Sequence, residues 1–372
     1  MARLVAMFNV LEEANRADIR QRRNLQRMHR YNTNSMNMDC EEFRRNYRLT
    51  KDLFSALLQD ISPFMKPQTR KSDISIKCKL LVTLSFYATG SYQRLVGRST
   101  STFMSQQSVS KAIREVTDAL CNARILSKYI KFPGSAEERN LIKTRFYEKF
   151  QIPGVLGCID GTHVAIIRPS LNEERYFNRK HYHSRNVQII CDSDLNILSV
   201  DGTFGGATHD SFIFSQHPIK AHLIDLISRG ETTYLLGDSG YAQREYLMTP
   251  IVNAAAGSPE DFYTKKHCSA RNTVERTIGL LKARWRCLLR HRVLHYNPQM
   301  ATKIINACCV LHNICNASNL PAPDAPDAQE EAAATDVRED DSSVSSRNDE
   351  LRQGQAARQR LVQNLWRSRQ QR

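Results

Sequence analysis

From residue 154 to residue 242 the chain consists of short apolar runs separated by turn residues, whereas the regions on either side have helical periodicity. The runs are VLGCI, HVAII, VQIIC, ILSVDGTF and TTYLLGD, and short apolar runs bounded by turn residues indicate buried strands. The expected order is three strands joined by short turns, a helix over 210–227, and a fourth strand. Strands joined by short turns pair antiparallel, whereas a strand reached through a helical crossover lies parallel. The sequence therefore predicts an α/β unit with a mixed sheet.

Two of these runs end on a carboxylate. Residues 155–159 lead into Asp160, and the run LLG leads into Asp238. A carboxylate at the end of a buried strand is held rigidly at the edge of a sheet, where open α/β sheets commonly place their chemistry. Two strands of one sheet that both end in this way can bring their carboxylates together. The alternative for Asp160 is structural, because Asp-Gly-Thr at 160–162 could form the turn of a hairpin.

A third acid, Glu275, lies near the start of an amphipathic helix expected over residues 270–289. On a helical wheel it shares one face with Arg271, Lys282 and Arg286. This pattern suits a helix face on which the cations contact a phosphate backbone and the single carboxylate binds a metal. The alternative is a surface ion pair between Arg271 and Glu275, which are four residues apart.

Asp160, Asp238 and Glu275 together offer oxygen ligands, which Mg²⁺ and Mn²⁺ prefer. Two such ions could activate a water or a hydroxyl group and stabilise the leaving oxygen of a phosphodiester. A basic surrounding would offset the charge of the substrate, which several carboxylates in one site would otherwise repel. The three acids therefore form the candidate catalytic group.

Basic residues exceed acidic ones, with 53 Lys and Arg against 38 Asp and Glu and a net charge of +15. Such an excess favours a polyanionic partner, nucleic acid first and a membrane surface second. The longest apolar runs are far too short to span a membrane. The ten cysteines form no CxxC pair, which favours free thiols in a reducing compartment.

The composition divides the chain into four regions. Residues 1–38 form a basic N-terminal arm, and residues 39–150 have helical periodicity throughout. Residues 151–316 contain the predicted strands and the acids. Residues 317–372 form a tail that is acidic to residue 350 and Arg-rich after it, with a composition typical of disorder and one marginal helix in the Arg-rich part.

Within the helical region, three consecutive helices with short joints are expected between residues 77 and 120. The last of them, in SQQSVSKAIREVTDAL, has an apolar stripe, and Lys111 and Arg114 fall outside it. This pattern is compatible with a helix-turn-helix unit whose final helix enters a DNA groove. An ordinary helical bundle with a solvated polar face is the alternative.

A further basic segment, residues 176–185, interleaves aromatic residues with cations that include Arg179 and Lys180. It could bind phosphates or stack bases near the acids. A solvated loop without either role fits the same residues.

Several longer motifs follow one another in the chain: IDGTHVAI, YFNRKHYHSRNVQIICD, GGATHDS, LLGDSGYAQREYLMTPI, RNTVERTIGLLKARWRCL and ACCVLHNIC. In this order they resemble the DDE endonuclease domain of PIF/Harbinger-type transposases, including the nucleases derived from Harbinger transposases in animals. The resemblance covers roughly residues 40 to 316. It is specific because several long motifs recur in the same order, not one short pattern.

The resemblance implies an RNase H-like fold and DNA strand cleavage that depends on a divalent metal, Mg²⁺ or Mn²⁺. The metal-binding acids of the family fall on Asp160, Asp238 and Glu275, and a fourth falls on Asp210. From its chemistry alone, Asp210 could equally cap a helix that begins at Ser211. The family commonly has Pro-Gly-Ser before this fourth acid, whereas this chain has Gly-Gly-Ala-Thr at 205–208.

The family also implies a separate Myb/SANT-like DNA-binding protein that brings the nuclease to DNA and into the nucleus, with a cytoplasmic pool when this partner is absent. A homo-oligomer is a further expectation. The preferred interpretation is a domesticated, transposase-derived DNA endonuclease without autonomous transposition. The alternatives are a DNA- or chromatin-binding protein that keeps the fold without cleaving, and an active Harbinger transposase.

Overall fold

A computed structural model describes residues 12–21, 24–25, 28, 35–70, 73–98, 103–323 and 346–370. The chain divides into two compact units, residues 1–122 and residues 123–372. Most of the predicted N-terminal arm and residues 324–345 of the predicted tail lie outside the described residues. The division falls earlier than the predicted boundary at 150/151, because α7 (Ala123–Tyr129) packs on α12 and α8 (Ala136–Phe150) packs on β1, both in the second unit.

The first unit is helical in its described part. Its helices are α2 (Cys40–Tyr47), α3 (Lys51–Ile61), α4 (Ile76–Thr89), α5 (Gln93–Gly97) and α6 (Gln106–Leu120), with short 3₁₀ turns at Ser35–Asn37 and Ser62–Phe64. Four of the helices begin after a residue whose side chain accepts a hydrogen bond from a backbone N–H of the first helical turn, and these residues are Asp39, Thr50, Ser75 and Ser105. The predicted run of three helices with short joints is present as α4, α5 and α6, which pack on one another.

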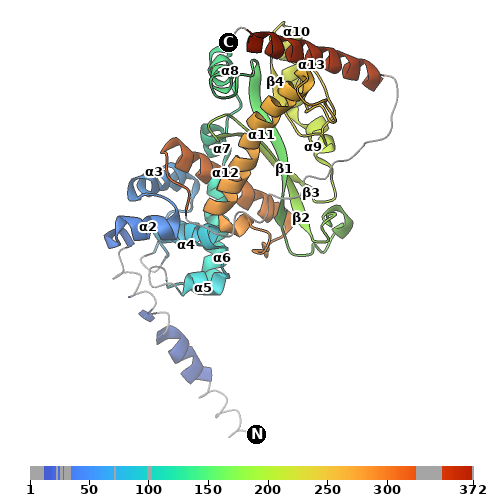
Figure 1. Cartoon of the computed structure of the whole chain (residues 1–372). Helices are drawn as coiled ribbons and strands as arrows, with labels where there is room; N and C mark the ends of the chain where they lie inside the picture. Colours follow the sequence, from blue (N-terminus) through green and yellow to red (C-terminus); the bar gives the residue numbers. More distant parts are fainter. Residues whose placement is uncertain are drawn as a thin grey trace. The chain divides into compact units, whose positions relative to one another are not determined.

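The second unit is built around a five-stranded sheet with the order β3-β2-β1-β4-β5 (Figure 1). The strands are β1 (Val155–Ala165), β2 (Ser184–Cys191), β3 (Ile197–Gly205), β4 (Tyr234–Leu236) and β5 (Leu247–Met248). β1, β2 and β3 pair antiparallel, whereas β4 lies parallel to β1 after the helices α9 (Asp210–Gln216) and α10 (Pro218–Ser228). The mixed sheet and its strand directions confirm the predicted pairing, and β5 adds a short fifth strand, parallel to β4.

The predicted strand end at Asp160 is wrong, because β1 continues through Asp160, Gly161 and Thr162 without a turn. Asp160 pairs with Ile189 of β2, and the ladder runs on to Ala165. A hairpin would need the two halves of β1 to pair with each other. Here β2 pairs with β1 from Cys158 to Ala165, across the Asp-Gly step, and this longer ladder overrides the local turn preference.

Helices cover both faces of the sheet, and the alternation of side chains along β1 assigns them. The Cys158 thiol donates to the Ala270 carbonyl of α11 (Pro259–Arg284), so α11 lies on the face toward which Cys158 points (Figure 1). The next side chain, Ile159, belongs to the apolar cluster that contains Phe214 of α9 and Leu223 of α10. α12 (Pro298–Ala317) packs on β3, β2 and α11.

The C-terminal part of the predicted disordered tail is a helix, α13 (Ser346–Gln370), which packs on α11 and β5. Leu361, Val362 and Leu365 are buried there, and the Trp366 ring lies 5.9 Å from the Phe262 ring of α11. The sequence suggests only a marginal helix, because most helical stability in proteins comes from packing, and the surface that receives this helix is remote in sequence. Among the described residues, no helix combines the length and apolar character needed to span a membrane.

Candidate active site

Asp160 lies within β1, and Asp238 follows the end of β4, the parallel neighbour of β1, by two residues. Cys158 of β1 is in register with Leu236 of β4, and each acid follows two residues later along its chain. Neighbouring strands are about 4.8 Å apart, so the two backbones bring these carboxylates close together. Each is oriented by a nearby backbone N–H, from Gly161 to Asp160 Oδ1 at 2.8 Å and from Gly240 to Asp238 Oδ1 at 3.0 Å.

Burial raises the pKa of Asp160 to about 7, against the lowering effect of Arg271, and the charges of Asp238 and Asp210 add to the rise. A carboxyl group with this pKa is half protonated near neutral pH. The three aspartates therefore share a region of excess negative charge that a bound cation would relieve.

Glu275 approaches the site from α11, which crosses β1 on the face toward which Asp160 points. Arg271, one helical turn earlier, donates to Glu275 Oε1 and places its other terminal nitrogen 3.5 Å from Asp160 Oδ2. The ion pair considered as the alternative for Glu275 is thus present. The same guanidinium also joins the glutamate to the β1 carboxylate, so the pair belongs to the candidate site.

Asp210 reaches β1 from the opposite face, as the first residue of α9. A Cβ added to Gly161 would lie 2.4 Å from both carboxylate oxygens of Asp210, so only glycine leaves room for this side chain. The cap position before α9 is taken by His209, not by Asp210. Burial raises the pKa of Asp210, while a hydrogen bond from Asn186 Nδ2 to its Oδ1 at 2.6 Å opposes the rise and the charge of Asp238 adds to it.

Asn186 and Gln188 of β2, which were not among the predicted site residues, hold Asp210 in place. Asn186 binds its carboxylate, and Gln188 Nε2 donates to its backbone carbonyl at 3.1 Å and to the Tyr241 hydroxyl at 3.2 Å. Both side chains are almost fully buried, and among the described residues Asn186 Oδ1 and Gln188 Oε1 have no hydrogen-bond partner. The available signal was one amide, Gln188, within the otherwise apolar run VQIIC, and a second, Asn186, directly before it.

The donor set has the chemistry of a site for Mg²⁺ or Mn²⁺, since all four candidate ligands are carboxylates and two of them are buried enough to raise their pKa. Asp160 and Asp210 meet β1 from opposite faces. Within the described ranges, no three His, Cys, Asp or Glu side chains are arranged to hold one ion. The cation that joins acids of β1 and α11 in this structure is the Arg271 guanidinium.

The predicted row of cations on the Glu275 helix is interrupted. α11 ends at Arg284 because Trp285 leaves the helical conformation and buries its ring completely, and Arg286 lies in a separate 3₁₀ turn (Arg286–Leu288). Lys282 is only 7% exposed and donates to the His163 carbonyl at 3.2 Å. Lys282 and Arg286 therefore do not form one exposed helix face with Arg271.

The other predicted DNA-contacting residues are on the surface. Lys111 and Arg114 are exposed on α6 in the first unit. Arg179 and Lys180 are exposed in the loop before β2, where Arg179 Nη2 lies 2.5 Å from His209 Nε2, next to Asp210. Asn178 Oδ1 accepts the Lys180 backbone N–H, so this loop has a defined conformation.

Residues 159–313 match the family model described as DDE superfamily endonuclease. The chain is 34% identical over 251 residues to the protein named "Putative nuclease HARBI1" of Bos taurus and 33% identical to that of Homo sapiens, and each match covers 67% of this chain and 70% of the relative. It is 23% identical over 254 residues to "Protein ALP1-like" of Arabidopsis thaliana, covering 65% of this chain and 61% of that protein.

No solved structure matches the chain significantly. The matched segment begins at the residue before Asp160 and ends in α12, so it contains all four acids of the candidate site. The identity to the animal proteins extends over two thirds of both chains. This chain therefore belongs to the family of Harbinger transposase-derived nucleases, which carry a DDE superfamily endonuclease domain.

Proposed function

We propose that this chain is a divalent-metal-dependent DNA endonuclease that hydrolyses phosphodiester bonds with Asp160, Asp238 and Glu275, and that Asp210 is a fourth metal ligand. The observation that carries the proposal is the position of Asp160 within β1 and of Asp238 directly after the parallel neighbour β4, with the glutamate on a helix that packs on β1. The strand order and strand directions of the sheet support an RNase H-like fold for this domain.

Bound at these carboxylates, Mg²⁺ or Mn²⁺ would activate the attacking water and stabilise the leaving oxygen. The protein contributes rigid backbone placement, since Asp160 is held within a long strand and Asp210 by Asn186. Binding of the metal would require the Asp160 and Glu275 carboxylates to turn from Arg271 toward the ion. Arg271 orients Asp160 and Glu275 and reduces the repulsion between them and the phosphate of the substrate.

For the DNA duplex, the proposed contacts are Lys111 and Arg114 of α6, as part of a helix-turn-helix-like unit, and Arg179 and Lys180 beside α9. The first pair lies on the polar face of an amphipathic helix, opposite the buried stripe, which supports this assignment. In the second pair, Arg179 contacts His209, the residue before the candidate metal ligand Asp210. Replacing either pair should weaken DNA binding and reduce its dependence on salt.

The test is nicking of supercoiled DNA in Mg²⁺ or Mn²⁺ by the wild type beside Asp160→Ala. The matched control is Asp225→Ala, which removes an exposed carboxylate of α10 that pairs with Arg229. The wild type and the control should nick DNA, and the Asp160 variant should not. Nicking that persists in Asp160→Ala, or in excess chelator, would refute the proposed chemistry.

A second candidate function is DNA or chromatin binding without cleavage. The observation that favours it is the engagement of two candidate ligands, Asp160 and Glu275, by Arg271. Salt-dependent DNA binding without nicking in either metal would support this function and exclude the first. Terminal inverted repeats flanking the gene would identify an active transposase, and their absence would indicate a domesticated nuclease.

We further propose that a Myb/SANT-like DNA-binding protein delivers the chain to DNA and to the nucleus, that the chain stays partly in the cytoplasm without it, and that it can form homo-oligomers. The support is the family membership alone. Depletion of the partner should move a tagged chain out of the nucleus. A nuclear pool of unchanged size would contradict this dependence.

A further inference from the structure

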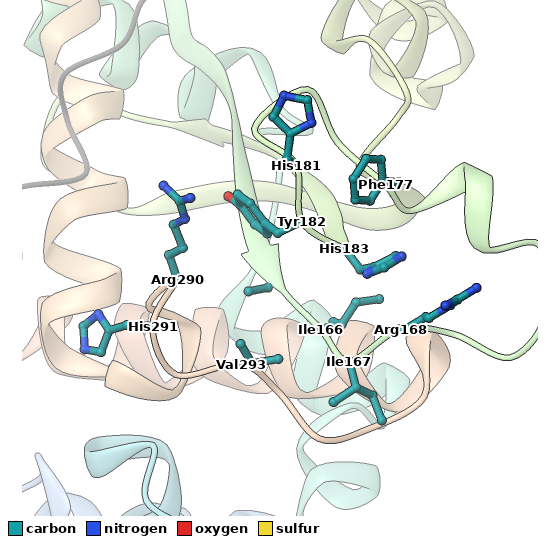
Figure 2. A pocket seen from close by; sticks show the side chains of 11 residues that line it. Ile166, Ile167, Arg168, Phe177, His181, Tyr182, His183, Arg290, His291 and Val293 are labelled. Atoms are coloured by element: carbon teal, nitrogen blue, oxygen red, sulfur yellow. The ribbon is translucent and has the colours of Figure 1, made fainter.

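A pocket of about 940 Å³ opens beside the far end of β1, away from the acids. Three segments line it: residues 165–168 at the end of β1, residues 177–183 before β2, and residues 290–293 after α11 (Figure 2). In this view Phe177, His183 and Arg168 lie on one side, and Tyr182 and Arg290 lie on the other. Ligand pockets commonly measure about 300–1,000 Å³, so a group as large as a nucleotide fits.

Backbone hydrogen bonds fix the three segments relative to one another. The Leu294 N–H donates to the Ala165 carbonyl at 2.9 Å, and the Ile167 N–H donates to the Leu294 carbonyl at 3.1 Å. The Ile166 N–H donates to the His183 carbonyl at 3.0 Å, and His183 forms a β-bridge with Phe177. The pocket is therefore formed before any ligand enters, which reduces the entropic cost of binding.

Flat, partly exposed rings make up much of the wall. The Phe177 ring is 45% exposed, and its centroid lies 5.3 Å from that of His183 and 6.1 Å from that of His181. Opposite, the Arg290 guanidinium lies 4.7 Å from the centre of the Tyr182 ring. Aromatic rings and arginine planes of this kind stack on nucleic-acid bases, whatever the base.

The charges around the pocket favour an anion. Arg168 and Arg290 are exposed among its lining residues. Glu173 is paired with Arg168 and lies 2.8 Å from His183 Nε2. A phosphate can bind at the arginines, where it would compete with Glu173 for Arg168, while its base occupies the ring-lined space.

β1 connects this pocket to the candidate active site. Asp160 and Ala165 are five residues apart on one strand, which is about 17 Å at about 3.3 Å per residue. That separation equals about five nucleotide steps at the duplex spacing of about 3.4 Å. A DNA strand whose phosphate lies at the carboxylates thus reaches the pocket within a few nucleotides.

We propose that this pocket binds one unpaired nucleotide of the DNA strand, a few nucleotides from the phosphate that is cleaved, with its base against Phe177 and Tyr182 and its phosphate at Arg168 and Arg290. A base within a duplex is stacked and paired on both sides, so only a frayed, flipped or single-stranded nucleotide can enter. The proposal deepens the proposed nuclease function and rests on it for the position of the cleaved phosphate.

The test measures binding of the full chain in chelator, where no cleavage occurs, to a fluorescent thymidine decamer and to a decamer of the same length that has abasic residues throughout. The wild type should bind the thymidine decamer more tightly. Phe177→Ala should lose about 5- to 100-fold in affinity for it, as expected for one stacked base, and Phe177→Trp should retain binding. The matched control is Tyr147→Ala, since Tyr147 on α8 is also 45% exposed and does not line the pocket.

Equal binding of the thymidine and abasic decamers, or equal binding by the wild type and Phe177→Ala, would overturn the proposal. Tighter binding of the corresponding RNA decamer would overturn the assignment to DNA. Asp160→Ala separates the two functions because it removes a candidate ligand for metal but no wall of the pocket. Loss of nicking with unchanged decamer binding in that variant is the expected result. Phe177-dependent binding without nicking by the wild type would refute the nuclease and retain the pocket.

Discussion

Replacing Asp160 with asparagine should stabilise the metal-free protein at pH 8 and do so much less at pH 5. Burial raises the pKa of this carboxyl group from 3.8 to about 7, despite the nearby Arg271. Between these two values the unfolded chain has lost the proton while the folded chain keeps it. The wild type therefore loses stability as the pH rises through this window, and the loss is complete above pH 7.

The size of this stability gain follows from how far the pKa of Asp160 is raised. A change of one unit in pKa corresponds to about 1.4 kcal/mol, so a rise of the Asp160 pKa from 3.8 to about 7 destabilises the ionised wild type by about 4 kcal/mol. Asparagine carries no charge at any pH and keeps an oxygen for the Gly161 N–H bond. The gain in the free energy of unfolding should grow from about 1.5 kcal/mol at pH 5 to at most about 4 kcal/mol at pH 8.

Guanidinium unfolding followed by tryptophan fluorescence measures this gain in the relevant unit. The chain has two tryptophans, Trp285 and Trp366, and both belong to the second unit. The control is Asp225→Asn, which alters an exposed ion pair on α10 and should change stability by only a few tenths of a kcal/mol at any pH. All samples contain chelator, because a bound cation would favour the ionised wild type.

Parallel stability curves for the wild type and Asp160→Asn between pH 5 and pH 8 would refute the reasoning. So would a variant that is less stable than the wild type at pH 8. Either result would mean that the folded protein ionises this carboxyl group as easily as the unfolded chain does.

Three further predictions follow from single contacts. Hydrogen bonds from α8 lower the pKa of Glu231 to about 2, so Glu231→Gln should reduce the free energy of unfolding by up to about 3 kcal/mol at pH 7. Unfolding curves should show this difference disappearing as the pH falls from 4.5 toward 2. Gly354→Ala would place a Cβ 2.6 Å from the Arg244 Cα, so it should reduce the free energy of unfolding by about 1–3 kcal/mol and make α13 sensitive to proteolysis. Unchanged protease resistance would contradict the packing described for α13. Gly161→Ala would press on the Asp210 carboxylate, so nicking should fall much further than stability does, and full activity in that assay would argue against a role for Asp210.

The local periodicity of the chain was enough to predict four of the five strands and their directions, apart from the short β5 and the point where β1 ends. Apolar runs of strand length report burial directly, and short turns or a helical crossover decide whether neighbouring strands lie antiparallel or parallel. The same reasoning predicted that two strands of one sheet lead to Asp160 and Asp238, and the structure makes these strands, β1 and β4, neighbours. The ordered motifs identified the family, because they extend over most of the second unit.

The predictions from sequence were wrong for features that depend on residues far away in the chain. Asp-Gly at 160–161 has the composition of a turn, yet pairing with β2 makes it the interior of a strand, and Gly161 is needed there to admit Asp210. The helix that carries Glu275 stops at Arg284 because Trp285 is buried.

The sequence by itself determined which residue types are available to the site and which elements carry them, since both are written in short-range patterns. Only the tertiary structure decided which side chains come together at the candidate site. Arg271 lies 111 positions from Asp160 and contacts it, and α13 folds onto α11 from the far end of the chain. No local pattern encodes such contacts, because they depend on which surfaces the packed sheet and helices leave exposed to one another.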